Sequence, residues 1–528
     1  MPYDDPAYIT GNEYINQGLS ADGLLWALTY RDSGRALAHE GAMNLWHPLT
    51  WISHQADVSV FGLRHVWGHH LHSVLLHAVA GCLLFSLCCY LGFSGRVAFF
   101  IAALFLVHPL RAESVAWLSA RKDVLSGVFF FGALWAALGG WRRMGLVLFA
   151  AAIAAKPSVV ILPVLLVLAQ GWRANERDWG PRFWWDGLRR EWAWFGLAGA
   201  GALVAIWFQS QGTHAPDMDA LPLPERLLTM ATAFLFLLFR SVFPVHLSFH
   251  YPYPEAGAVF HLLSWAFVGT VGSLLLTFRK HLHGFWVAVL WYVVCWLPMS
   301  GLVYVGTSFT HDRYAYLALV GPTAWAVAAL SKLRFGWIVC AGLVLAYGTL
   351  ATLQTSAWRS GESLFARAHA NQPRDIVATV NLGSVYQVEG RHEEALALFE
   401  KTLARHPHHR IALFNQGNSL HALGRWPEAA KAFRGAVAVD PSFAGAWRNL
   451  GLVLTDPQNP HTDPAAARDA FLAAWEHSGE RDAVALFLLI RTEFQLGHFT
   501  SGRARLPTLR ALDPRDPTIR RHLEQWGE

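Results

Sequence analysis

The feature that most constrains this chain is a series of apolar runs, most of them roughly 18 to 25 residues long, in its first two-thirds. A helix rises about 1.5 Å per residue, so a run of that length crosses the ~30 Å hydrocarbon core of a bilayer. Charge is scarce in this region, because 39 of the chain's 79 Lys, Arg, Asp and Glu residues lie from Arg359 onward. We therefore predict that lipid surrounds the first part of the chain and water surrounds the last third.

Each apolar run is predicted to be a helix, because only a helix satisfies every backbone polar group inside lipid without a neighbouring strand. About eleven such segments fill residues 66–356. They are expected near 66–90, 96–108, 123–141, 144–156, 157–171, 192–210, 225–243, 258–278, 284–304, 314–331 and 335–355.

The positions of Lys and Arg predict the orientation of these segments. Basic residues such as Arg142 and Lys332 fall in every second short loop, which the positive-inside rule assigns to the cytoplasm. The other loops then face outward: residues 1–65, 109–122, the tip at Lys156, 211–224 and 305–313. Two points stay open. The first is run 225–243, which lies between two outward loops: it is re-entrant, or interfacial, or one of the predicted spans is wrong. The second is the pair of short runs 144–156 and 157–171, which form either two spans or one kinked span.

The last third of the chain is repetitive. Gly383, Gly417 and Gly451 recur at 34-residue intervals, and Pro407 and Pro441 keep the same interval. Glycine and alanine alternate with phenylalanine around these positions, as in a 34-residue helix–turn–helix repeat in which two helices approach closely. We predict about four tetratricopeptide-type repeats in residues 357–528, an array that binds peptides or protein partners.

Composition excludes some classes of function. The net charge is only +5 and no basic block alternates with aromatic residues, so nucleic acid is not an expected partner. The five cysteines lie in apolar segments without metal-ligand spacing. Several histidines cluster in 65–77, but no acidic residue is expected to accompany them, so we predict no metal site there.

Polar residues that could carry chemistry fall in the loops assigned outward. A carboxylate there could act as general base toward a hydroxyl group, and arginine and lysine could hold a phosphate. A phosphate donor with a lipid tail would explain why the protein is built into a membrane. Lys156 alone could equally be an interfacial lysine that extends toward water. The candidates are Asp4, Asp5, His47, His108, Arg111, Glu113, Arg121, Lys122, Lys156, His311, Asp312 and Arg313.

Six stretches make the chain resemble a known family. They are Tyr-Asp-Asp-Pro-Ala-Tyr-Ile-Thr-Gly-Asn at 3–12, Trp-His-Pro-Leu-Thr at 46–50, the run from Gly68 to His77, His-Pro-Leu-Arg-Ala-Glu-Ser-Val-Ala-Trp-Leu-Ser-Ala-Arg-Lys-Asp at 108–123, Ala-Lys-Pro at 155–157, and His-Asp-Arg-Tyr-Ala-Tyr-Leu at 311–317. With the terminal repeats, these stretches resemble the transmembrane and tetratricopeptide-repeat-containing O-mannosyltransferases and, more broadly, the GT-C superfamily of glycosyltransferases.

The resemblance implies an inverting transfer of one sugar, such as mannose, from a polyprenyl-phosphate donor to a hydroxyl group of a protein Ser or Thr. It implies that Asp4 or Asp5 is the catalytic base and that the phosphate is bound by basic residues at the membrane face, for which Arg121, Lys122, Lys156 and Arg313 are candidates. In that family a membrane helix precedes the acidic loop, whereas the acidic pair here stands at positions 4 and 5.

The overall expectation is an all-α protein. An external segment with short helices (1–65) precedes a GT-C-like bundle of membrane helices (66–356) and a repeat solenoid (357–528). We expect a multi-pass protein of a bacterial inner membrane, with the site and the repeats on the extracytoplasmic side. Its partners would be the lipid bilayer, a lipid-linked sugar, an acceptor protein or glycan, and a protein bound by the repeats. No cofactor is required, although a divalent cation is compatible. Two alternatives remain: a transferase that modifies lipid or polysaccharide, and a non-enzymatic membrane-anchored scaffold.

Overall fold

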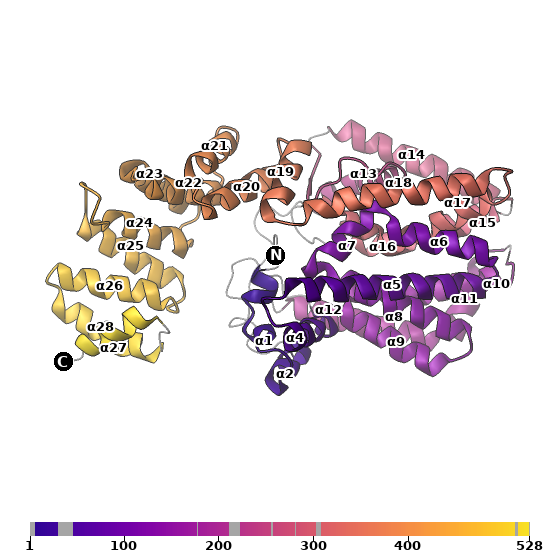
Figure 1. The fold of residues 1–528 in the computed structure, drawn as a ribbon, viewed down its shortest axis with the longest axis horizontal. Helices are drawn as coiled ribbons and strands as arrows, with labels where there is room; N and C mark the ends of the chain where they lie inside the picture. The colour runs from indigo at the N-terminus through magenta and orange to yellow at the C-terminus, as the bar shows by residue number, and fades with distance from the viewer. Residues whose placement is uncertain are drawn as a thin grey trace. The chain divides into compact units, whose positions relative to one another are not determined.

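The computed structural model describes residues 6–29, 46–176, 178–210, 222–254, 257–279, 281–302, 308–512 and 516–526. It divides into two compact units, Met1–Asn371 and Gln372–Glu528 (Figure 1). Helices account for 79% of the chain, which confirms the predicted all-α class.

Three helices of the first unit are long and apolar enough to cross a membrane: α5 (Val66–Tyr90), α14 (Ala258–Phe278) and α18 (Gly336–Ala357). Two bent helix pairs are also long and apolar enough when each pair is taken together; the first is bent by 54° and the second by 82°. By length and composition the described residues therefore hold three spans, or up to five if each bent pair counts as one span. Every predicted apolar run contains a helix, while the number of about eleven spans remains a prediction. The bent pairs are α6 (Gly95–Val107) with η2 (Pro109–Arg111) and α7 (Ala112–Ala116), and α11 (Pro181–Arg190) with α12 (Trp192–Ser210).

The structure bears on both points that the sequence left open. Run 225–243 is one unbroken helix, α13 (Leu223–Val242), without the internal turn that a re-entrant segment needs. The chain between α9 (Arg142–Ala155) and α10 (Leu162–Arg173) leaves the helical conformation at Lys156, where φ is −157°. A proline at the next position disfavours a helical residue before it, which explains the break at Lys156.

One predicted helix ends early. Run 284–304 forms α15 (His283–Trp296) and then a single 3₁₀ turn, η5 (Leu297–Met299), which contains Pro298. The remaining elements of the unit are η1 (Pro6–Thr10), α1 (Glu13–Asn16), α2 (Ala21–Thr29), α4 (Pro48–Phe61), η3 (Leu118–Ala120), α8 (Arg121–Leu138), η4 (Pro157–Ile161), β1 (Tyr251–Pro252), β2 (Ser308–Thr310), η6 (Asp312–Tyr314), α16 (Ala315–Ala318), α17 (Val320–Leu330) and α19 (Gly361–Asn371).

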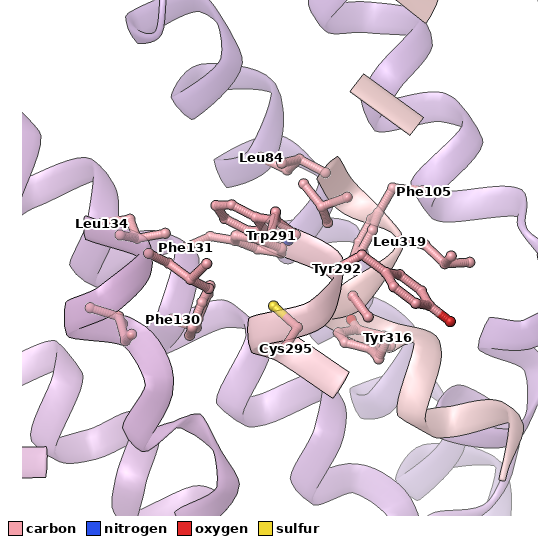
Figure 2. Packing of buried hydrophobic residues seen from close by; sticks show 14 of the residues in the cluster. Leu84, Phe105, Phe130, Phe131, Leu134, Trp291, Tyr292, Cys295, Tyr316 and Leu319 are labelled. Atoms are coloured by element: carbon pink, nitrogen blue, oxygen red, sulfur yellow. The ribbon is translucent and has the colours of Figure 1, made fainter. Parts of the chain in front are cut away.

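Aromatic side chains fill the interior of the first unit. Phe130 of α8 lies edge-on to Trp291 of α15, with ring centroids 6.3 Å apart, and Phe105 of α6 lies edge-on to Tyr316 at 5.3 Å (Figure 2). Edge-to-face contacts of this kind add to the free energy gained by burying the rings. This core holds together helices that lie far apart in the chain.

A smaller cluster packs the N-terminal elements against the bundle. Trp26 of α2 and Trp51 of α4 are both 2% exposed, and they pack with Leu118 of η3. Helix α4 is also linked to α9, because the hydroxyl of Thr50 donates to the carbonyl of Ala155 at 3.0 Å. The described helices before α5 are therefore a packed part of the unit, and α4 lies next to the start of α8.

The described residues of the second unit form four antiparallel helix pairs and a terminal helix. Gly383, Gly417 and Gly451 each lie seven residues after the start of the first helix of a pair, where a Cβ atom would meet a phenylalanine ring at 2.5–2.7 Å. The predicted close approach of the two helices at glycine is confirmed. The pairs are α20 (Ile376–Val388) with α21 (His392–Leu403), α22 (Arg410–Ala422) with α23 (Trp426–Val439), α24 (Ala444–Leu454) with α25 (Pro464–His477), and α26 (Ala483–Gln495) with α27 (Phe499–Ala511), followed by α28 (Pro517–Gln525).

Candidate functional site

The first ion pair of the candidate site joins two segments that are far apart in the chain. Glu113, in the first turn of α7, is 2% exposed and pairs with the guanidinium of Arg313 in η6. The backbone N–H of Arg313 also donates to Oε2 of Glu113 at 3.0 Å, and Nδ1 of His311 lies 3.6 Å from Oε1. The two loops predicted to face outward, 109–122 and 305–313, therefore meet at one buried carboxylate.

Asp312 points to a different partner. Its Oδ1 accepts a hydrogen bond from the hydroxyl of Tyr251 in β1 at 2.9 Å. Strand β1 pairs with β2 in an antiparallel two-stranded sheet, which holds the chain just before His311 in place. Burial, with a further contribution from the nearby charge of Glu113, raises the pKa of Asp312 well above its usual 3.8.

The second ion pair joins α8 to the break after α9. Asp123, in the first turn of α8, is 2% exposed, and its Oδ1 pairs with the ammonium of Lys156. The other oxygen, Oδ2, is buried and has no hydrogen-bond partner among the described residues. The side chain of Lys156 is only 15% exposed, so it extends to a carboxylate in the protein interior rather than to water at the membrane interface.

His47 adds α4 to the same region. It lies just before the first residue of α4, is 3% exposed, and has Nδ1 3.1 Å from the hydroxyl of Tyr8 in η1. Burial, together with the charges of Lys122 and Lys156, lowers the pKa of His47 well below its usual 6.5, so the ring is neutral near pH 7. The ammonium of Lys122 lies 5.8 Å from the centre of the Tyr8 ring.

These contacts connect ionisable side chains from five segments into one cluster. The charge of Asp123 acts on both Glu113 and Arg313, and that of Lys156 acts on His311, which places the two ion pairs within electrostatic reach of each other. Asp4 and Asp5 lie outside the described residues. We define the site cluster as His47, Glu113, Lys122, Asp123, Lys156, His311 and Arg313.

Three of the predicted site residues have partners elsewhere in the protein. Nε2 of His108 lies 3.0 Å from the carbonyl of Ser241, and Nη1 of Arg111 donates to the carbonyl of Ala315 at 2.6 Å. Arg121 is fully buried and forms an ion pair of 2.5 Å with Asp57 of α4. The contacts of these three residues hold helices and loops together.

Asp57 is the residue that the sequence analysis missed. Its Oδ1 lies 2.6 Å from Nδ1 of His72, and its Oδ2 lies 3.4 Å from Nδ1 of His69. The statement that no acidic residue accompanies these histidines is therefore wrong. A detectable signal was present, since His54 and Asp57 on one helix, and His69 and His72 on the next, each stand three residues apart and so share a helix face.

Comparisons with known proteins agree with both parts of the chain. A family model described as tetratricopeptide repeat matches residues 380–442 and 417–460. Protein O-mannosyl-transferase tmtc2 of Xenopus laevis is 36% identical over 101 residues, which are 19% of this chain and 12% of that protein. TMTC2 of Homo sapiens is 32% identical over 133 residues, 25% of this chain and 15% of that protein. The chain is similar to proteins named protein O-mannosyl-transferase.

A longer match covers most of the chain at lower identity. Protein O-mannosyl-transferase F38B6.6 of Caenorhabditis elegans is 22% identical over 424 residues, 74% of this chain and 58% of that protein. These relatives confirm the similarity to O-mannosyltransferases that carry tetratricopeptide repeats. Among solved structures, the crystal structure of MamA matches 31% of this chain and 93% of that chain, with 15% identity and a TM-score of 0.27.

Proposed function

We propose that this chain is a membrane glycosyltransferase that moves a hexose, such as mannose, from a polyprenyl-phosphate donor to the hydroxyl group of a protein Ser or Thr. The observation that carries the proposal is the convergence of two ion pairs, Glu113–Arg313 and Asp123–Lys156. Their residues come from three distant stretches of a chain whose relatives are named protein O-mannosyl-transferases. A scaffold that acted only through its repeats would not need these buried charges, which are costly within a membrane protein.

In the proposed reaction, the acceptor hydroxyl oxygen attacks C1 of the sugar. A new C1–oxygen bond forms while the bond from C1 to the donor phosphate oxygen breaks, so the configuration at C1 inverts. The hydroxyl proton passes to a carboxylate, a role that we assign to Asp4 or Asp5. The bonding electrons leave with the phosphate, whose added negative charge needs cationic partners.

The cationic partners proposed for the phosphate are Lys122, Lys156 and Arg313. Lysine binds phosphate as a point charge, whereas the guanidinium of arginine can make two parallel hydrogen bonds to it. Asp123 and Glu113 hold Lys156 and Arg313 in place, which reduces the reorganisation that binding would otherwise require. His47 is neutral and can accept or donate a hydrogen bond beside them.

Transfer from purified lipid-linked sugars to protein is the direct test. The full chain, reconstituted in liposomes, is incubated with radiolabelled polyprenyl-phosphate mannose or glucose and a protein extract, and label in protein and in lipid is counted. Asp4→Asn with Asp5→Asn should abolish the transfer, and Lys156→Gln should lower the rate by about 10²-fold, as expected when one transition-state contact is removed.

The control for Lys156→Gln is Lys332→Gln, which changes an exposed lysine outside the site cluster and should leave the rate unchanged. Truncation after Asn371 removes the second unit and distinguishes a protein acceptor from a lipid or polysaccharide acceptor. If the repeats recruit the acceptor protein, the truncated chain should no longer label protein. Persistent label in lipid or polysaccharide would favour the alternative acceptor. Absence of transfer from either donor, or full activity of Lys156→Gln, would refute the proposal.

A further inference from the structure

A second group of titratable side chains lies on α4 and α5, apart from the ion pairs of the site cluster. His54, Asp57 and His69 are all buried, and one ligand-type atom from each lies within 4.8 Å of the other two. Two imidazole rings and one carboxylate are a ligand set found in metal sites of proteins.

The hydrogen bonds of His69 set the proton on its ring. Nε2 lies 3.0 Å from the carbonyl oxygen of Gly62, and a carbonyl only accepts, so Nε2 carries the hydrogen. In the neutral ring Nδ1 is then a lone pair, and it faces Oδ2 of Asp57 at 3.4 Å. Two acceptors facing each other at this distance repel unless a cation lies between them. Histidine ligands of metals commonly donate their other ring N–H to a carbonyl in this way.

His54 shows the same need for a partner. Its side chain is fully buried, and neither ring nitrogen has a hydrogen-bond partner among the described residues. A neutral imidazole has one donor and one acceptor, and leaving such buried polar atoms unpaired destabilises the fold. A metal ion bound to one nitrogen would remove part of this cost.

The ligand types, and the separation of His69 from Asp57, favour zinc. In a tetrahedral site with bonds of about 2.0–2.1 Å, neighbouring ligand atoms are about 3.3–3.4 Å apart, which agrees with the 3.4 Å between His69 and Asp57. Mg²⁺ and Ca²⁺ prefer six or more oxygen ligands, and only one carboxylate is available here. The guanidinium of Arg121 lies 2.5 Å from the same Asp57 oxygen, so its charge opposes weakly bound cations and favours a metal that binds imidazole strongly.

We propose that His54, Asp57 and His69 bind a zinc ion that ties α4 to α5. Three protein ligands leave one tetrahedral position for a water molecule. Arg121 and His72 donate to the Asp57 carboxylate and position it for the metal. The site is independent of the sugar-transfer proposal and stabilises the part of the chain that supports His47.

Metal content and thermal stability of the full-length protein in detergent test this proposal without any activity assay. The protein is loaded with ZnCl₂, desalted and analysed by mass spectrometry for zinc. Stoichiometric zinc is expected in the wild type and in the control His65→Gln, which changes an exposed histidine one residue before α5. His54→Gln and His69→Gln should lose the zinc.

A second measurement covers the case in which these variants do not fold. A chelator should lower the melting temperature of the wild-type protein, and added zinc should restore it. Absence of zinc from the loaded wild type, or an unchanged melting temperature with chelator, would overturn the proposal, and a protonated His69 paired with Asp57 would then explain the contact. Equal zinc in the wild type and in folded His54→Gln and His69→Gln would also overturn it.

Discussion

Gly417→Ala tests how the tetratricopeptide-type repeats pack. The new Cβ would lie 2.7, 2.8 and 2.9 Å from three ring atoms of Phe433, which is fully buried. Overpacking of this kind costs about 1–3 kcal/mol. Alanine also favours the helix by about 1 kcal/mol relative to glycine, so the net loss of unfolding free energy should be about 0–2 kcal/mol.

The decisive quantity is the coupling between Gly417 and Phe433. Phe433→Leu alone leaves a cavity and should cost on the order of 2 kcal/mol. In the double variant the smaller leucine makes room for the new methyl group, so the two costs should not add. We expect a coupling energy of about 1–3 kcal/mol that favours the double variant. The fourth pair likewise has a side chain at the glycine position facing a leucine, with buried Ile490 and Leu506 seven residues after the starts of α26 and α27.

Urea unfolding of the fragment 372–528, followed by circular dichroism, measures these free energies, because the unit is compact and has its own apolar core. Gly435→Ala is the matched control: it is also in a helix, but its Cβ would be 3.4 Å from the nearest atom, so it should be neutral or stabilising by up to about 1 kcal/mol. Additive costs for Gly417→Ala and Phe433→Leu, within about 0.3 kcal/mol, would refute the packing argument.

Three further predictions concern buried polar groups. Arg313→Met should destabilise the full chain in detergent by about 3–5 kcal/mol, because Glu113 would be left buried without its partner; thermal unfolding should show this loss and a partial recovery when Glu113→Gln is added. Tyr316→Phe should cost about 1–3 kcal/mol in the same assay, since Nδ1 of His77 lies 2.9 Å from the hydroxyl that would be lost, while the substituted phenyl ring would keep the aromatic packing. Burial acts to raise the pKa of Asp440, but the hydrogen bonds that its carboxylate accepts outweigh burial and lower the pKa below the usual 3.8. The carboxylate therefore stabilises the repeats fully above its unfolded-state pKa and loses this effect as pH falls through the lower folded-state pKa. The difference in urea midpoint between wild type and Asp440→Asn should be present at about pH 7 and shrink as pH falls below about 4.

The helices could be predicted from the sequence because their signal is local. A run of apolar residues long enough to cross lipid must be helical there, and the runs 66–90, 192–210 and 258–278 agree with α5, α12 and α14 at both ends. The 34-residue spacing similarly places each glycine opposite a phenylalanine. The fourth repeat departs from this spacing, since Gly497 lies in the turn before α27 with φ of 79°, and the close-packed position holds Ile490.

The partners of buried charges could not be predicted in this way, because they depend on which helix ends meet. Nothing in the period of the sequence pairs Glu113 with Arg313, 200 residues later, or β1 with β2. A charged side chain in a loop gives the same sequence signal whether it faces a substrate or an internal carboxylate.

Arg121 and Lys122 are neighbours in the chain and were predicted together, yet successive residues at the start of a helix point about 100° apart. Arg121 therefore reaches Asp57 on α4, while Lys122 lies near Tyr8 and His47. The same helix start thus supplies one arginine that fixes the N-terminal segment to α5 and one lysine that belongs to the site cluster. Sequence proximity identified the correct loop, and the direction of each side chain decided its role.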